Sequence, residues 1–343
     1  MPARFKDASA PFSGATYTDN STILGLDFPS DFILRSSDGV DFHLHKAFLR
    51  FVSGCFEGMF TFPGGDEDPS ALVRDGKPVV VLPEPESVLY KLLSLAYPAQ
   101  SPELYTLTEA DLDRAVALHE AAHKYQFIHV QRLFERMLQN SALLDAHPYR
   151  LYAIARLCDI PALTTKATLS TLKSDGRPAR PKFPELKLIT WEDGNKLQAF
   201  HRSCGEEAKK IVEETASVSR LEDRGMKAGT RDANGHIVAI GFQFFVWWAA
   251  KEHGSECGPK TQNGGQIIGP TSWFATYITR LAQQLYLVPS RSTVETEALT
   301  LAPAEHAIID KCPACAKRAE RDLWIFAHQL ANQIDTSNHN LGQ

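Results

Sequence analysis

The sequence lacks the excess of basic residues that a protein coating nucleic acid needs. It has 36 Lys and Arg against 41 Asp and Glu, a net charge of -5, and neutralising phosphates takes a basic face. It also lacks a long apolar run. The longest, from Ile237 to Ala250, has 14 residues, fewer than the roughly 20 that cross a bilayer. We therefore expect neither nucleic acid nor a membrane as partner, and we interpret the aromatic residues at 242–248 as part of a buried core helix.

The first residues lack the apolar core of a secretory signal, so we expect the chain in a reducing compartment, the cytoplasm or the nucleus. In such a compartment we expect its six cysteines to be core thiols or metal ligands in preference to disulfides. The sequence also has no Gly-x-Ser-x-Gly nucleophile elbow and no phosphate-binding Gly-Lys-Ser/Thr loop. A length of 343 residues and an ordinary globular composition predict two compact units.

Local patterns predict a β-hairpin followed by helices. Short alternating runs at 31–34 and 41–44 flank Asp38-Gly39, and Asp-Gly between such runs is a strong hairpin signal. Apolar residues then recur at helical spacing from His45 to Phe60, which predicts one helix. The next expected elements are an exposed loop at 61–77 and a strand at 79–82. Helices are expected at 87–97 and from 108 to beyond 138, with the helical pattern continuing to 172. Further helices are expected at 191–212, 242–250, 272–287 and 313–334.

Two blocks of residues follow one another in a family-specific order. The first block is Asp31-Phe32-Ile33-Leu34, Gly39, Phe42, His45-Lys46, Leu49, Ser53, Phe56 and Met59-Phe60; the second is Leu82-Pro83-Glu84, Leu92-Leu93, Tyr97 and Leu118-His119-Glu120-Ala121-Ala122-His123-Lys124-Tyr125. Together they resemble a BTB (POZ) domain in the divergent form common in mushroom-type fungi. The resemblance implies an α+β fold, a short β-sheet flanked by helices, followed here by a mainly α-helical C-terminal region.

The resemblance also implies protein–protein interaction. BTB domains form homodimers or larger assemblies, and many hold a client against a cullin ubiquitin ligase. Asp31 and Lys46 resemble the buried acid and base near the family's dimer groove, since two buried charges are tolerated only as a pair; a strand-end acid and a solvated lysine are the alternative. We expect self-association through the hairpin and the first helix, which present the family's dimer face and include His45 and Leu49. Leu107-Thr108-Glu109 resembles the hydrophobic-x-Glu of cullin adaptors, although Thr108 as a helix cap explains the same residues.

The domain organisation follows from these elements and from the composition of the segments between them. A stretch with Pro178, Pro181 and Pro184 and several basic residues is typical of a semi-rigid linker. The expected order is a flexible leader at 1–28, the BTB domain at 29–140, a helical extension at 141–173, a Pro-rich basic linker at 174–187, a mainly α-helical domain at 188–336 and a tail at 337–343.

Two histidine motifs suggest metal-dependent chemistry. His119-Glu120-x-x-His123 has the spacing of a zinc hydrolase helix, with His129 as the third ligand. In that class a glycine at 126 turns the chain so that the third histidine returns, whereas this sequence has Gln126. Asp41-x-His43-x-His45 would place three donors on one strand face. We predict no catalytic residue, no cofactor and no enzyme activity, with a zinc-dependent hydrolase or a transcription-related scaffold as the alternatives.

The late cysteines form the remaining metal candidate. Cys312 and Cys315 have the Cys-x-x-Cys spacing that favours tetrahedral zinc. His201 with Cys204, and His253 or Cys257, could complete the set. The alternative is a plain helix start, with Pro313 in the first turn, and the sequence leaves the two possibilities open.

Overall fold

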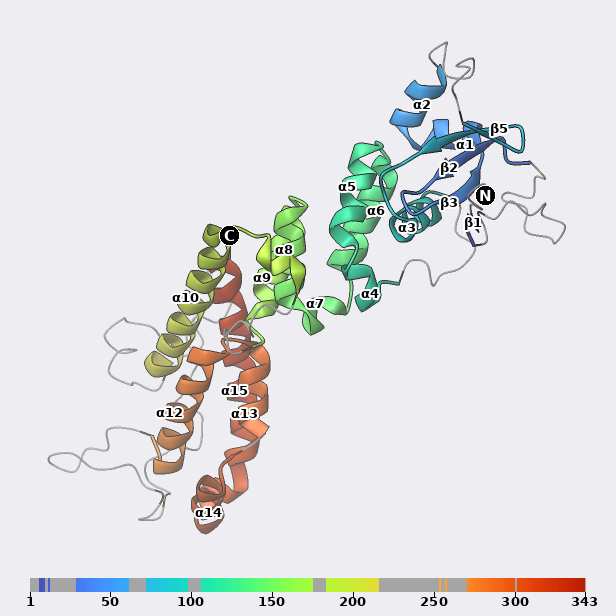
Figure 1. Ribbon diagram of the computed structural model, residues 1–343. Coiled ribbons are helices and arrows are strands. Elements are labelled where there is room, and N and C mark those ends of the chain that lie inside the picture. The colour runs from blue at the N-terminus through green and yellow to red at the C-terminus, as the bar shows by residue number, and fades with distance from the viewer. Residues whose placement is uncertain are drawn as a thin grey trace. The chain divides into compact units, whose positions relative to one another are not determined.

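The computed structural model describes residues 6–9, 12, 29–61, 72–97, 106–174, 183–215, 253, 257, 270–299 and 301–342. The chain divides into two compact units, residues 1–164 and 165–343, and the elements of each are labelled in Figure 1. The aromatic residues at 242–248 lie outside the described residues. No helix among those described has both the length and the apolar character needed to cross a bilayer.

The first unit is built on a five-stranded sheet. Its strands are β1 (Lys6–Asp7), β2 (Phe32–Arg35), β3 (Val40–Leu44), β4 (Val73–Arg74) and β5 (Lys77–Val81), in the order β1-β3-β2-β5-β4. The predicted hairpin is confirmed, because β2 pairs antiparallel with β3 in the register Ile33 to His43. Gly39 in its turn has a φ of 81°, a conformation that glycine adopts at little cost.

A second hairpin occupies the end of the segment that we expected to be an exposed loop. β4 pairs antiparallel with β5, with Arg74 opposite Lys77. Asp75 and Gly76 form the turn, and both have positive φ values, 51° and 73°, as a two-residue hairpin turn requires. The loop prediction is therefore wrong for residues 73–77, while residues 62–71 lie outside the described part of the chain.

The N-terminal segment is not a loose leader throughout. β1 pairs with β3 in parallel, Lys6 opposite Val40. Further along, Phe12 is 1% exposed and lies edge-on to Tyr90 and Tyr97, with ring centroids 5.8 and 5.4 Å apart. Residues 6–8 and 12 therefore belong to the sheet and core, which corrects the expected flexible leader at those positions.

Helices pack around this sheet (Figure 1), with α3 lying against α5 and α6. The expected single helix at 45–60 is broken at Ser53, whose hydroxyl donates to the Tyr125 carbonyl at 2.6 Å and accepts the Phe56 N–H at 3.2 Å. The expected continuous helix after Thr108 is likewise divided, and at Gln126 the chain turns with a φ of 56°. The helices are α1 (Lys46–Val52), α2 (Gly54–Thr61), α3 (Glu86–Ala96), α4 (Glu109–Leu112), α5 (Ala115–Lys124), α6 (Ile128–Gln139), α7 (Leu143–Ala146) and α8 (Pro148–Leu157).

The division between the units falls within α9 (Pro161–Thr171), inside the expected helical extension. Of the expected linker at 174–187, residues 175–182 lie outside the described residues. Residues 184–187 form a short 3-10 helix, η3 (Pro184–Lys187), in which Glu185 is buried. The linker is therefore ordered at its C-terminal end.

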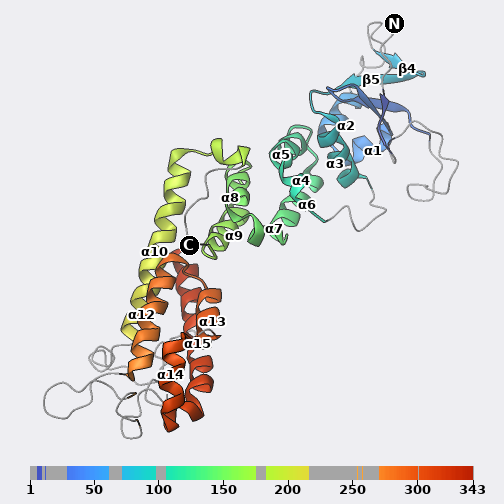
Figure 2. The ribbon, with the colours of Figure 1, turned by 60° about the horizontal axis from the view of Figure 1, so that its bottom comes forward.

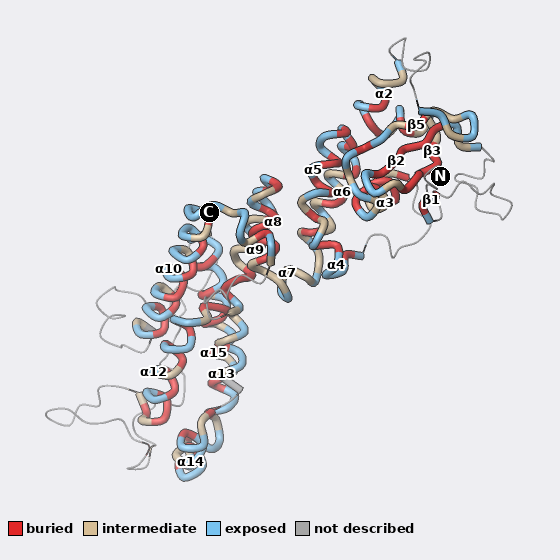
Figure 3. The backbone as a smooth tube through the Cα atoms, in the orientation of Figure 1, coloured by how far each residue is buried: buried red, intermediate tan, exposed pale blue. Residues whose placement is uncertain are grey.

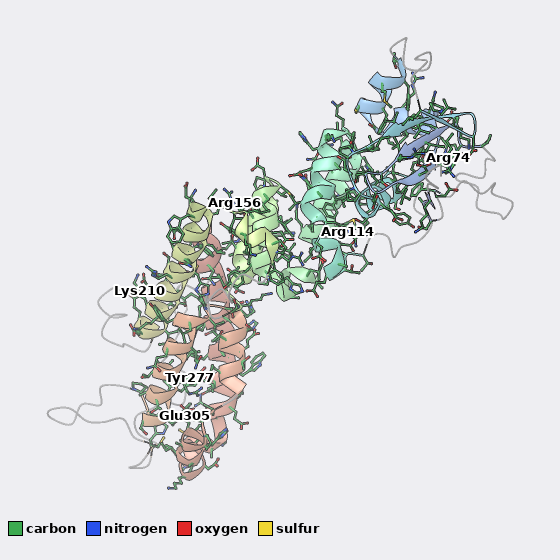
Figure 4. All side chains as sticks on the ribbon, in the orientation of Figure 1. Arg74, Arg114, Arg156, Lys210, Tyr277 and Glu305 are labelled. Atoms are coloured by element: carbon green, nitrogen blue, oxygen red, sulfur yellow. The ribbon has the colours of Figure 1, made fainter. Side chains whose placement is uncertain are left out.

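The second unit is helical, as expected. α10 packs against α12 and α15, and α13 packs against α15, so that these helices run alongside one another in Figure 2. Arg280 of α12 also binds Glu305 of α14 at 2.8 Å; Figure 4 labels Glu305 together with Tyr277 of α12. The helices are α10 (Trp191–Thr215), α12 (Ser272–Leu287), α13 (Arg291–Leu299), α14 (Pro303–Lys311) and α15 (Pro313–Leu341).

The core of this unit is shared by α10, α12, α13, α14 and α15, and in it Trp273, Phe274 and Phe326 are completely buried. Figure 3 shows buried positions along α10, α12 and α15 in red. α15 continues to Leu341, so helix extends into the segment 337–343 that we expected to be a tail. Asn338 explains the extension, because its side-chain amide donates to the carbonyl of Pro289 at 2.7 Å.

Candidate functional site

Two distant parts of the second sequence block, Leu82-Pro83-Glu84 and the run that ends at Tyr125, meet in space. Glu84 follows β5, and its carboxylate accepts hydrogen bonds from Lys124 Nζ at 2.8 Å and from the Tyr125 hydroxyl at 2.6 Å. Burial alone would raise the pKa of Glu84, but these two bonds hold that pKa below its ordinary value. Burial and the same carboxylate raise the pKa of Tyr125 to about 12. The contact fixes the end of α5 to the sheet.

A buried charge network holds the edge of the sheet. Asp41 is fully buried and accepts two hydrogen bonds from Arg35, at 2.6 and 2.8 Å, and one from Arg74, labelled in Figure 4. Asp7 of β1 also binds Arg74, at 2.8 Å. Burial opposes ionisation of Asp41, but the two guanidinium groups outweigh it and lower the pKa of Asp41. Asp41 therefore has a structural role in this sheet.

Asp31 and Lys46 come together at the start of α1, although not as a buried ion pair. Asp31 is exposed, and its Oδ1 accepts the backbone N–H of Lys46 at 2.8 Å. A carboxylate in this position satisfies a free N–H of the first helical turn and interacts favourably with the helix dipole. The Lys46 ammonium lies 5.6 Å from the centroid of the Phe60 ring. In the single chain Asp31 is therefore exposed, and its burial with Lys46 at a dimer groove stays a prediction.

The other two residues expected at the dimer face differ in exposure. The backbone N–H of His45 donates to the Tyr97 hydroxyl at 3.2 Å, and its side chain is half-buried. Leu49 has no exposed surface, so it is a core residue that a partner cannot contact. Phe51, which the sequence analysis missed, is 88% exposed on the same helix, with Ala47 one turn before it also exposed. Ala47 and Phe51 thus form an apolar patch on the outward face of α1, next to the exposed Arg50.

The candidate cullin motif lies at the start of α4. Thr108 caps this helix, and Asp111 completes a capping box, as the alternative reading predicts. Leu107 is only 9% exposed, whereas the side chain of Glu109 is 63% exposed and lies 3.6 Å from His147 Nε2. Of the motif's two recognition residues, only Glu109 is available to a partner.

The histidines of the His-Glu-x-x-His motif do not converge. His119 is buried, with its Nε2 3.2 Å from Glu135 Oε1 and 3.3 Å from Gln131 Nε2, while His123 and His129 are exposed. The chain does turn at Gln126, contrary to our argument from the missing glycine. The turn brings α6 back onto α5, and through it Glu135 reaches His119.

The strand motif at 41–45 likewise forms no metal-binding group among the described residues. The Asp41 carboxylate accepts hydrogen bonds from Arg35 and Arg74, and His43 Nε2 lies 3.2 Å from Asp7 Oδ1. His45 is at the start of α1, where its backbone is held by Tyr97.

The late cysteines do converge with other donors. Cys312 and Cys315 lie close to His253 and Cys257. His201 and Cys204, the other sequence candidates, do not belong to this group; His201 Nε2 lies 3.1 Å from the Ser174 carbonyl. Of the residues that the sequence offered as further ligands, the structure thus places His253 and Cys257 next to Cys312 and Cys315.

Comparison with known families identifies the first unit. Residues 25–142 match the family model of the BTB/POZ domain, which agrees with the 29–140 expected from the sequence. No curated protein matches the chain. The chain therefore contains a BTB/POZ domain, a protein-interaction fold, followed by a helical C-terminal region.

Proposed function

We propose that this protein acts by binding other proteins and that its BTB domain pairs two copies of the chain through the outward face of α1. Phe51 is the observation that carries the proposal. A phenylalanine that is 88% exposed leaves apolar surface in water, and burying it contributes about 1.5–3 kcal/mol. In a two-fold dimer the same patch is used by both copies, so this contribution counts twice.

Neighbouring residues support this assignment. Asp31 and the half-buried Lys46 lie at the start of the same helix, where a partner could cover them as charges at the rim of an apolar patch. The inward face of α1 is already used, because Leu49 is fully buried. The outward face is therefore the one left for a second copy.

The test compares Phe51→Lys with the wild type by light scattering coupled to size-exclusion chromatography. Losing two buried aromatic contacts should weaken dimerisation by at least about 100-fold. Trp191→Lys is the matched control, since Trp191 is 84% exposed but lies in the second unit, and it should leave the mass unchanged. Equal masses for wild type and Phe51→Lys would refute the assignment of the α1 face.

A cullin-adaptor role is the second proposal, favoured by one observation, the exposed carboxylate of Glu109 at the start of α4. Leu107 weighs against it, because the apolar half of the motif is buried. Co-purification with a cullin, lost in Glu109→Ala and kept in Phe51→Lys, would support this role. Unchanged co-purification in Glu109→Ala would exclude Glu109 from the contact.

A further inference from the structure

Four metal-ligating side chains converge in the second unit. The Sγ atoms of Cys257, Cys312 and Cys315 and a ring nitrogen of His253 all lie within 4.8 Å of one another. The three cysteines are buried, and His253 is half-buried. This Cys3His cluster, as we name these four residues, is separate from the BTB domain and takes no part in its proposed function.

The start of α15 explains how two of the ligands come together. Cys312 is the residue before the helix, with extended backbone (φ -103°, ψ 112°), and Pro313 begins the helix. Proline is favoured at this position because its fixed φ suits the first turn and its missing N–H has no partner to lose there. The Cys-x-x-Cys spacing then places Cys315 in the first turn, beside Cys312.

The other two ligands come from the region that precedes α12. The carbonyl of Cys257 accepts the backbone N–H of Ser272 at 3.2 Å, which joins Cys257 to the beginning of α12. His253 lies four residues earlier and directs its Nδ1 toward the cysteines. The cluster therefore links two distant parts of the chain. Cys257 and Cys312, the nearest ligands from the two parts, are 55 positions apart in the sequence.

The distances fit a tetrahedral metal ion. His253 Nδ1 is 3.3 Å from Cys312 Sγ and 3.5 Å from each of Cys257 and Cys315 Sγ. The sulfurs of Cys257 and Cys315 are 3.4 Å apart. Zinc bonds of about 2.3 Å to sulfur and about 2.0 Å to nitrogen put neighbouring ligand atoms about 3.5–3.8 Å apart in a tetrahedron. These four separations need only a slight expansion to hold the ion, and the remaining two, from Cys312 Sγ to the other two sulfurs, lie within 4.8 Å.

Hydrogen bonding alone does not account for this arrangement. An imidazole Nδ1 carries either one hydrogen or one lone pair, so it can serve one sulfur fully, yet three sulfurs surround it at similar distances. A disulfide does not account for it either. It would pair two of the three cysteines, leave the third over, and give the histidine nitrogen no role. None of the six cysteines forms a disulfide.

The surroundings supply a further partner to the cluster. Trp273 is fully buried, and its indole N–H donates to Cys315 Sγ at 3.3 Å. Donors to ligating sulfurs orient them and stabilise their negative charge. The beginning of α15 adds the positive end of a helix dipole next to Cys315.

We propose that His253, Cys257, Cys312 and Cys315 bind one Zn²⁺ ion as a structural site. Three thiolates and one imidazole are a ligand set typical of structural zinc, which binds them in tetrahedral geometry. Four protein ligands fill the coordination sphere, which leaves no position for a substrate or an activated water. The ion fixes His253 and Cys257 to the starts of α12 and α15. This assignment departs from our sequence-based expectation of no cofactor.

The first test uses the wild-type full chain, so it does not depend on a variant that folds. Chain produced in zinc-supplemented medium and dialysed should retain about one zinc ion per molecule by elemental mass spectrometry. Replacing zinc with Co²⁺ should produce intense visible bands of tetrahedral cobalt together with thiolate-to-cobalt charge transfer. A chain that keeps no zinc and gives no such bands would overturn the proposal.

The second test locates the ion. Cys312→Ser should lower the bound zinc at least about tenfold. Cys204→Ser is the matched control, because Cys204 is also buried in the second unit but lies outside the cluster, and it should keep the ion. His119→Ala should keep it as well. Zinc retained in Cys312→Ser, zinc lost in His119→Ala, or a disulfide between Cys257 and Cys315 in zinc-supplied protein would each contradict the assignment.

Discussion

The hydroxyl of Tyr125 donates a hydrogen bond to the carboxylate of Glu84 across 2.6 Å, joining residues 41 positions apart. It connects the segment after β5 to the end of α5, and both belong to the second block of residues that resembles a BTB domain. Because Tyr125 is 6% exposed, the bond forms away from water, where an unmade hydrogen bond is costly.

Tyr125→Phe should therefore lower the free energy of unfolding by about 1–2 kcal/mol. Lys124→Ala removes the other donor to Glu84, but the Lys124 side chain is half exposed, so its loss should cost less than about 1 kcal/mol. Urea unfolding of the full chain by far-ultraviolet circular dichroism measures both. All five tryptophans lie at or beyond position 191, so tryptophan fluorescence should report no change in the second unit. A larger loss in Lys124→Ala than in Tyr125→Phe would contradict this ranking.

Asp41 should make the BTB domain sensitive to acid. Its pKa is lowered in the folded chain, so it adds stability above its unfolded pKa of about 3.9, and that stability is lost as the pH falls toward the folded value. At neutral pH, Asp41→Asn should cost about 3 kcal/mol, because it leaves a buried arginine without its counter-charge.

The same variant should also flatten the decline of stability below about pH 4. Asp75→Asn is the control, since Asp75 is 69% exposed beside Arg74. Unfolding curves for the three proteins at neutral and acidic pH provide the comparison. An Asp41→Asn protein with the stability and acid sensitivity of Asp75→Asn would rule out this role.

The end of α15 should contribute to the stability of the helical unit. Asn338→Ala removes the donor to the Pro289 carbonyl and should cost about 1–3 kcal/mol, because Asn338 is buried and the carbonyl loses its partner. Asn340→Ala changes an exposed residue and should have little effect. Tryptophan fluorescence during urea unfolding measures the difference, and equal midpoints for the two variants would contradict it.

The cysteines should differ sharply in reactivity toward iodoacetamide. Cys55 is exposed, whereas burial raises the pKa of both Cys158 and Cys204 to about 12, which leaves almost no thiolate at neutral pH. Mass spectrometry after brief alkylation should find Cys55 modified first and Cys158 and Cys204 modified only after unfolding. Early modification of Cys204 in the folded chain would contradict its burial.

Local signals in the sequence predicted the elements that depend on neighbouring residues. Asp38-Gly39 gave the hairpin, and Thr108 with Asp111 gave a helix start that the capping box confirms. Asp75-Gly76 has the same hairpin signal, but the acids and glycines before it favour an exposed loop. Gln126 shows the limit of a local argument, because packing of α6 against α5 imposes a positive φ that glycine would adopt more readily.

Features that depend on distant contacts could not be read from the sequence. Nothing near Phe12 indicates that it packs against Tyr90 and Tyr97, which follow it by more than 75 residues. Helical spacing places Leu49 and Phe51 on one short helix but does not say which of them faces the core. Likewise, the spacing of Cys312 and Cys315 predicts two ligands of a metal site. Which residues complete the site depends on the fold, which brings His253 and Cys257, and not His201 and Cys204, next to these cysteines.

Sedimentation equilibrium of the full wild-type chain, across a range of micromolar concentrations, tests the central proposal most directly. One chain has a mass of 38.1 kDa. Pairing through α1 predicts a species of twice that mass, which dissociates on dilution and is lost in Phe51→Lys. A single species of 38.1 kDa at every concentration would contradict the proposal that this BTB domain joins two copies of the chain.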